Sequence, residues 1–253
     1  MKNIKKFNTE LLYNNFLESD NYKRPNISKV ENKVYYNKRI KRDFMTLIHY
    51  WDSEDVGNSG TWVDRINNHP LNRFGNPTVN SEGLLEVSVN NSFGRAYSVN
   101  IYLGDEWEIE SKFMIPKKPT NNTCYIFDFG SLYNSQHAFG LNISSNIYTN
   151  SKLNGNGSTS LYNIVVPFDS YGKLTKIAVG MERYDNQYNI HYVRYNNNTY
   201  YAPNLVLREY ATFNANFNRD EFYIGRGTSA DTQYQSDEIK YIKYVKIYKY
   251  DNS

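Results

Sequence analysis

Cysteine is almost absent from this chain of 253 residues. The single one, Cys124, cannot form a disulfide within the chain or supply a multi-cysteine zinc site. A secreted fold stapled by disulfides is therefore excluded. Long apolar runs are also missing: the opening MKNIKKFNTELLYNNF has no apolar signal segment, and no stretch approaches the 18 residues of a membrane span. We expect neither signal-driven export nor membrane insertion.

Neither sign of charge dominates. The chain has 29 basic and 26 acidic residues, and the net charge of +3 is too small to predict a nucleic-acid partner. No phosphate-binding or dinucleotide-binding glycine motif is present. These absences argue against nucleotide and nucleic-acid functions.

Aromatic side chains are abundant, with 25 Tyr and 13 Phe, which suits broad pleated sheets. After Arg42, short runs with period-two alternation follow one another, separated by Gly, Asn, Asp or Pro. This pattern predicts an all-β fold, a two-sheet antiparallel jelly-roll sandwich over residues 44–253. The expected strands are 44–51, 84–89, 97–103, 107–115, 124–129, 137–143, 161–166, 173–184, 187–195, 205–213, 221–227 and 238–250.

Residues 1–43 differ from the rest and form a separate N-terminal arm. Apolar residues recur at helical spacing over 8–19, which predicts a short amphipathic helix followed by an extended segment. A helix of this length is marginal in isolation, so we expect the arm to pack on a partner chain or on the sandwich. A partly ordered tail is the alternative.

Two sets of motifs resemble the laminin G-like branch of the concanavalin A-like lectins and glucanases. The first is Trp51-Asp52 followed by Gly60-Thr-Trp-Val-Asp-Arg, and the second is Phe222-Tyr-Ile-Gly-Arg-Gly followed by the strand at 237–248. The resemblance covers about residues 46–250 and implies the fold more than a function. Within that last strand, lysines recur every three residues from Lys240 to Lys249, so either a bulge or buried lysine stems are expected.

The arm resembles an N-terminal segment of virion proteins from phages of gut bacteria. The resemblance is carried by Phe7, Tyr13, Ser19-Asp20 and the stretches at 25–28 and 34–37. It implies that residues 1–43 dock on other virion proteins while the sandwich faces outward. The expected location is then the virion, assembled in the host cytoplasm, and a homo-oligomer is expected.

Glu106-Trp-Glu-Ile-Glu is the strongest sign of an enzyme. Alternate residues of a strand share a face, so Glu106, Glu108 and Glu110 line up. Retaining glycosidases of the resembled fold carry their two carboxylates in this way. The competing interpretation places Trp107, Ile109 and Phe113 inward and leaves the glutamates on a solvated outer face, and we therefore expect no catalysis.

Metal binding rests on acidic residues alone. Sandwiches of the resembled family often hold calcium at one rim, and Asp52 and Asp64 are the candidate ligands, although turn formation and surface charge also explain them. Glu54, Asp55, Asp128 and Asp231 are further candidates. The four histidines lie in separate segments without metal-ligand spacing, so the sequence predicts no histidine site.

The predicted function is that of a non-catalytic phage fibre or decoration protein that recognises host-surface glycans. Recognition is assigned to the loops at 52–68 and 227–237 with Trp62 and Arg226, and to Tyr188 and Tyr192, because tyrosine rings stack on sugar C–H groups. The tyrosines are equally explained as core residues. A glycoside hydrolase using the three glutamates and a purely structural interface module are the alternatives.

Overall fold

The structure is a computed structural model, and it places much of the chain after residue 44. The residues that it describes are 45–56, 61–88, 90–94, 100–119, 124–129, 137–155, 158–161, 164–208, 213–216, 222–226 and 238–250. The arm predicted for residues 1–43 and the loop at 227–237 lie outside them. Within the described ranges, none of the helices has the length and apolar character needed to cross a bilayer.

Sheet A has eight strands, and the C-terminal strand lies near its middle. The order is β16 (Asn198–Leu207), β15 (Tyr188–Tyr195), β14 (Thr175–Arg183), β8 (Trp107–Met114), β19 (Lys240–Tyr250), β5 (Leu85–Val87) and β4 (Thr78–Val79), and β1 (Met45–Asp52) also pairs with β19. A short 3-10 helix, η1 (Ser53–Asp55), follows β1.

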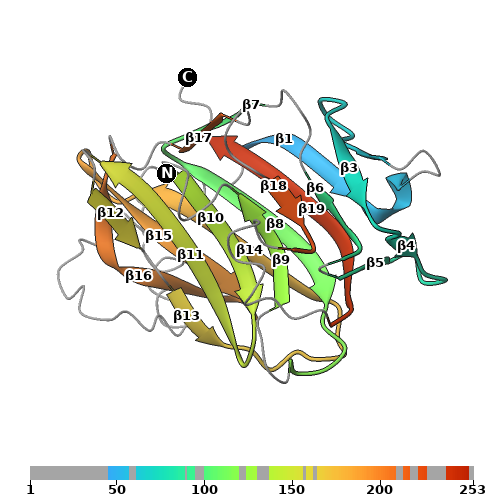
Figure 1. Ribbon diagram of the computed structural model, residues 1–253. Helices are drawn as coiled ribbons and strands as arrows, with labels where there is room; N and C mark the ends of the chain where they lie inside the picture. The colour runs from blue at the N-terminus through green and yellow to red at the C-terminus, as the bar shows by residue number, and fades with distance from the viewer. Residues whose placement is uncertain are drawn as a thin grey trace, which may run out of the picture.

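Sheet B has nine strands. The order is β12 (Ser158–Leu161), β11 (Asn146–Gly155), β10 (His137–Ile143), β9 (Cys124–Phe129), β18 (Phe222–Ile224), β6 (Ser92–Gly94), β3 (Pro70–Phe74) and β2 (Thr61–Val63), and β13 (Ile164–Pro167) pairs with β11. A separate ribbon joins β7 (Asn100–Gly104) to β17 (Phe213–Asn216). All the described pairings are antiparallel. The predicted two-sheet sandwich is confirmed (Figure 1).

The hydrophobic core lies between the inner faces of the two sheets. In β8 the predicted inward stripe of Trp107, Ile109 and Phe113 is fully buried. Sheet B contributes Leu141 and Ile143 to the same cluster. Buried apolar area of this kind is the main favourable contribution to folding.

Two hairpin turns of sheet A follow from local chemistry. The β14–β15 hairpin turns at Asp185, whose Oδ1 accepts hydrogen bonds from the backbone N–H of Gln187 and Tyr188, both at 2.7 Å. Asn196 and Asn197, with φ of 50° and 62°, make the β15–β16 turn in the left-handed region that asparagine tolerates.

The lysine spacing of β19 is resolved in both of the expected ways. The register against β8 shifts between Ile242 and Tyr244, so Lys243 forms a bulge. Lys240 is buried, with 1% of its surface exposed. The bulge lets later residues of β19 return to regular alternation.

Candidate functional site

The outer face of sheet A carries Glu108 and Glu110 of β8 and Glu106, the residue just before β8, and all three are buried. Glu106, Glu108 and Glu110 have only 4%, 1% and 4% of their surface exposed. The prediction that they point away from the core is confirmed by the burial of Trp107 on the opposite face. The prediction of a solvated face is wrong, because side chains from neighbouring strands enclose these carboxylates.

Glu108 is held by two side chains of β15. Tyr192 Oη donates to Glu108 Oε2 at 2.7 Å, and Arg194 forms an ion pair with the same oxygen at 2.7 Å. The Arg194 guanidinium also lies 4.7 Å from the centroid of the Tyr192 ring. Burial and the neighbouring Glu108 carboxylate raise the pKa of the Tyr192 phenol well above its usual value, so it stays a neutral donor.

The other two glutamates are fixed in the same manner. Glu110 forms an ion pair with Lys176 at 3.5 Å and accepts a hydrogen bond from Tyr244 Oη at 2.9 Å. Burial, together with Glu110, raises the pKa of Tyr244. Glu106 pairs with Arg183 at 3.0 Å. Each buried carboxylate therefore faces a cation, which offsets the cost of its burial.

Half-buried aromatic and basic side chains lie beside this row, where β19 meets β1. We call Tyr50, Tyr244 and Lys246 the tyrosine patch. The two rings meet edge to face at 6.1 Å, and Lys246 Nζ lies 4.5 Å and 4.6 Å from their centroids. Register places all three on the outer face, because Tyr50 pairs with Lys246 and Lys246 pairs with Glu110.

Asp52 is surrounded by donors and cations. Tyr50 Oη donates to its Oδ2 at 2.5 Å, Lys243 Nζ lies 3.2 Å from Oδ1, and Arg65 lies 3.5 Å from Oδ2. Desolvation alone would raise the pKa of Asp52, but hydrogen bonds from Tyr50, the Glu54 backbone and Lys243 hold it below the usual value. Both carboxylate oxygens of Asp52 therefore already face a cationic side chain.

Asp64 organises a different corner, the turn between β2 and β3. Its Oδ1 accepts from the backbone N–H groups of Tyr50 at 2.8 Å and Ile66 at 2.9 Å, and its Oδ2 accepts from Asn67 at 3.2 Å. The carboxylate is fully buried. Although desolvation opposes it, hydrogen bonding to His49 and to these amides lowers the pKa of Asp64.

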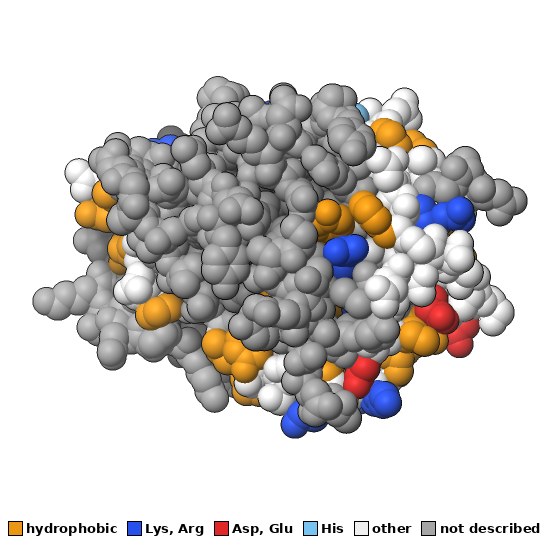
Figure 2. Space-filling model, in the orientation of Figure 1, with side chains coloured by type: hydrophobic (Ala, Val, Ile, Leu, Met, Phe, Trp, Pro, Cys, Tyr) orange, Lys and Arg blue, Asp and Glu red, His pale blue; other side chains and the backbone are white. Residues whose placement is uncertain are grey.

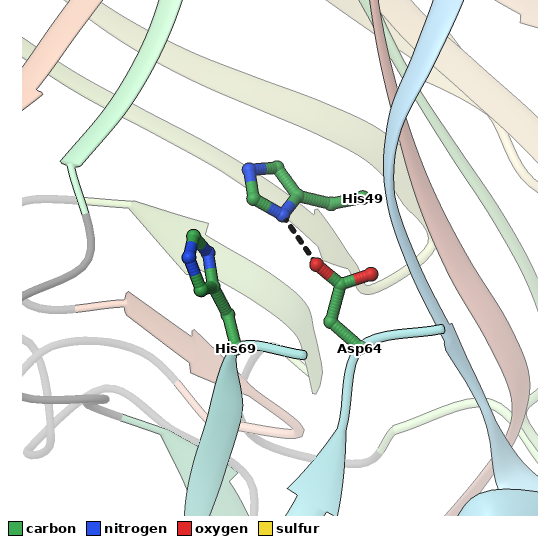
Figure 3. A group of neighbouring side chains, drawn as sticks. All are labelled: His49, Asp64 and His69. Carbon is green, nitrogen blue, oxygen red and sulfur yellow. Dashed lines mark hydrogen bonds and ion pairs between the residues drawn. The ribbon is translucent and has the colours of Figure 1, made fainter. Parts of the chain in front are cut away.

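Two histidines complete this corner (Figure 3). His49 Nδ1 lies 2.7 Å from Asp64 Oδ2, and one ligand atom each of His49, Asp64 and His69 falls within 4.8 Å of the others. His49 stacks on Trp51 at 5.2 Å and lies 5.3 Å from the His69 ring. Burial and the neighbouring His49 lower the pKa of His69. The prediction that the histidines form no cluster is wrong.

The predicted calcium site is not assembled among the described residues. Asp52 faces Lys243 and Arg65, whereas Asp64 faces His49. Calcium takes oxygen ligands, so neither environment fits it.

The predicted glycan-binding residues do not converge. Trp62 is fully buried: its Nε1 donates to the Asp52 carbonyl at 2.6 Å, and its ring packs edge-on against Phe93 at 5.5 Å. Tyr192 is 1% exposed. Neither ring offers a face to a sugar, which corrects both predictions. Tyr188 is half-buried at the start of β15.

Arg226 lies elsewhere, two residues after the end of β18 in sheet B. It is half-buried, and its guanidinium lies 4.9 Å from the Tyr223 ring and 5.5 Å from the Phe74 ring. Figure 2 shows basic and hydrophobic side chains side by side on the visible face of the molecule. Arg226 and Tyr188 remain predicted contacts, in different sheets.

Comparison with known proteins establishes the fold. No family model and no curated protein matches the sequence. The chain is similar to a botulinum neurotoxin DC binding domain solved in complex with SialylT, with a TM-score of 0.53, 14% identity, and coverage of 81% of this chain and 48% of that one. For a structure named HCR/D-Sa-GBL1/C the TM-score is 0.52 and the identity 13%, and the match covers 81% of this chain and 48% of that one. For a Trypanosoma rangeli sialidase in complex with sialic acid the TM-score is 0.45 and the identity 16%, and the match covers 81% of this chain and 31% of that one.

The chain thus spans about half the length of the first two structures and about a third of the sialidase. The likeness to the first two structures, at 14% and 13% identity, shows a shared fold and leaves function to the chain's own residues.

Proposed function

We propose that this protein recognises a glycan without catalysing a reaction on it, and that the outer face of sheet A is the contact surface. The tyrosine patch carries this proposal. Tyr50 and Tyr244 supply half-buried rings beneath Lys246, and the Lys246 ammonium can donate to hydroxyl or acidic groups of a sugar packed against them.

The polar groups beside the patch are already fixed. Tyr244 Oη is bonded to Glu110 and Tyr50 Oη to Asp52. A sugar would therefore meet an ordered surface, and little side-chain entropy would be lost on binding. The complex of the similar neurotoxin binding domain with SialylT is in keeping with this proposal.

Glycan arrays with purified protein test the patch. Lys246→Gln should weaken binding of the retained glycan at least tenfold, about 1.4 kcal/mol, because an ammonium donor is lost. Lys173→Gln, at an exposed lysine before β14, is the matched control and should bind as the wild type does. If the wild type retains no glycan, or if Lys246→Gln binds as well, the proposal is wrong.

A glycoside hydrolase is the second candidate, and the burial of the three glutamates favours it. Residues two apart on a strand have Cα atoms about 7 Å apart, which allows their carboxyl groups to flank one glycosidic bond as in glycosidases. Against it, Glu108 and Glu110 are each held in an ion pair and a tyrosine hydrogen bond. Sugar release from bacterial polysaccharide that disappears in Glu110→Gln would replace the binding proposal with this one.

A more specific proposal concerns where the protein acts, namely in a phage particle. We assign the chain to a bacteriophage virion, assembled in the host cytoplasm, as an oligomeric fibre or decoration subunit that docks through residues 1–43. The resemblance of the arm to virion proteins supports this assignment. Deleting residues 1–43 should abolish association with particles while leaving glycan binding intact; unchanged association would refute the docking role. A chain that associates but binds no glycan would be a structural interface module.

A further inference from the structure

We propose that His49, Asp64 and His69 form a binding site for a borderline divalent cation of the zinc class. The three residues come from β1, the turn after β2, and the residue before β3. Two imidazoles and one carboxylate are a donor set that zinc accepts, with water as a fourth ligand. Calcium would not select these nitrogen donors.

The Asp64 carboxylate is oriented as a ligand would be. Backbone amides of Tyr50, Ile66 and Asn67 hold it from outside the cluster, which leaves Oδ2 facing His49. Outer hydrogen bonds of this kind fix metal-binding carboxylates in known sites. The Asp64 side chain is therefore already directed toward the position that an ion would take.

The His49–Asp64 contact has nearly the spacing that zinc requires. Nδ1 and Oδ2 are 2.7 Å apart, with a proton between them. Ligands at zinc bond lengths of about 2.0–2.1 Å in tetrahedral geometry are roughly 3.3 Å apart. An ion can replace this proton if the two atoms separate by about half an ångström, which small side-chain rotations supply.

His69 supplies the third ligand, and it is the only one of the three side chains that is partly exposed to solvent. Its Nδ1 is buried and has no hydrogen-bond partner among the described residues. The rest of the side chain is half-buried, and its backbone carbonyl is anchored by Trp51 Nε1 at 3.2 Å. A buried nitrogen lone pair without a partner is unfavourable, and a cation would satisfy it.

An ion at this site would tie the two sheets together. His49 belongs to sheet A, whereas His69 directly precedes β3 of sheet B. Because an unfolded chain does not hold the three ligands in place, binding would stabilise the folded state.

Zinc titration of the full-length, chelator-treated protein tests the site. We expect one equivalent of Zn²⁺ to bind by calorimetry, together with a rise in Tm, and both should be lost in His69→Gln. His137→Gln, on β10, is the control and should retain both. If the wild type binds no more zinc than His69→Gln, the proposal is overturned.

A second measurement locates the ion. His49 is stacked on Trp51, so Cu²⁺ bound here should quench Trp51 fluorescence strongly in the wild type and weakly in His69→Gln. Equal quenching in both proteins would place the ion elsewhere and overturn the assignment. This measurement does not require a His49 variant, whose burial makes it a risk to folding.

Discussion

Tyr192 lies across Gly180 and reaches Glu108 on the far side. Gly180 pairs with Glu108 in β8 and with Tyr192 in β15. A Cβ on Gly180 would lie 2.5 Å from Tyr192 Oη and 2.6 Å from its Cζ, and would collide with the Trp107 carbonyl. The absence of a side chain at this position allows the tyrosine to bridge a strand and bond to Glu108.

Gly180→Ala should therefore destabilise the protein by about 1–3 kcal/mol through overpacking. Urea unfolding measures the change. In a double-mutant cycle with Tyr192→Ala, the cost should fall, because part of the clash is with the tyrosine ring. An additive cycle would show that this ring does not occupy the space over Gly180.

Arg194→Gln should destabilise the protein by about 3 kcal/mol, because it leaves the buried Glu108 carboxylate without its cation. Glu108→Gln combined with Arg194→Gln should cost less than the sum of the single changes, since no buried charge is left alone. Lys173→Gln, at an exposed position, is the control and should change stability little. Strictly additive effects would contradict the pairing.

Alkaline pH should loosen the corner where Tyr50 bonds to Asp52. Burial, and then the hydrogen bond to Asp52, raise the pKa of Tyr50 from 10.0 to about 12. The folded state holds this proton more tightly than the unfolded state does. The contribution of Tyr50 to the stability of the fold is therefore complete below pH 10 and is lost as pH rises through about 12. Tyrosinate absorbance should show this late titration in the wild type and not in Tyr50→Phe. Identical profiles would refute it.

Acidic pH should weaken the same Tyr50–Asp52 interaction by protonating Asp52. The pKa of Asp52 lies below its usual 3.8 in the folded state, so its contribution is present above that value and is lost as pH falls through the folded pKa. Asp52→Asn should flatten the acid limb of a Tm-against-pH curve. Asp55→Asn, in the adjacent η1, serves as the control. If Asp52→Asn leaves the fall of Tm at acidic pH unchanged, the assignment is contradicted.

The strands were largely predictable because each alternates against a buried face. The predicted stretch 107–115 and β8 (Trp107–Met114) nearly coincide, and so do 44–51 and β1 (Met45–Asp52). The stretch around Tyr200 was harder. The expected strands leave a gap between 195 and 205, yet β16 (Asn198–Leu207) runs through it without interruption, including Pro203.

The sites were less predictable, because they depend on which strands become neighbours. Alternation correctly turned Glu108 outward, but only the pairing of β14 and β15 beside β8 encloses it. His49 and His69 lie on different sheets, so no sequence spacing relates them. The sequence signal that could have pointed to this cluster is Asp64. This acidic residue follows Trp62-Val63 and lies between the two histidines in the sequence.

The position of β19 has a consequence for the order of folding. Strand β8 pairs with one edge of it, and β1 and β5 pair with the other. Among the described strands β1 pairs only with β19, so residues 45–52 must wait for a partner segment that is synthesised about two hundred positions later. We expect sheet A to close only after synthesis of β19, with the slow kinetics of distant strand pairing.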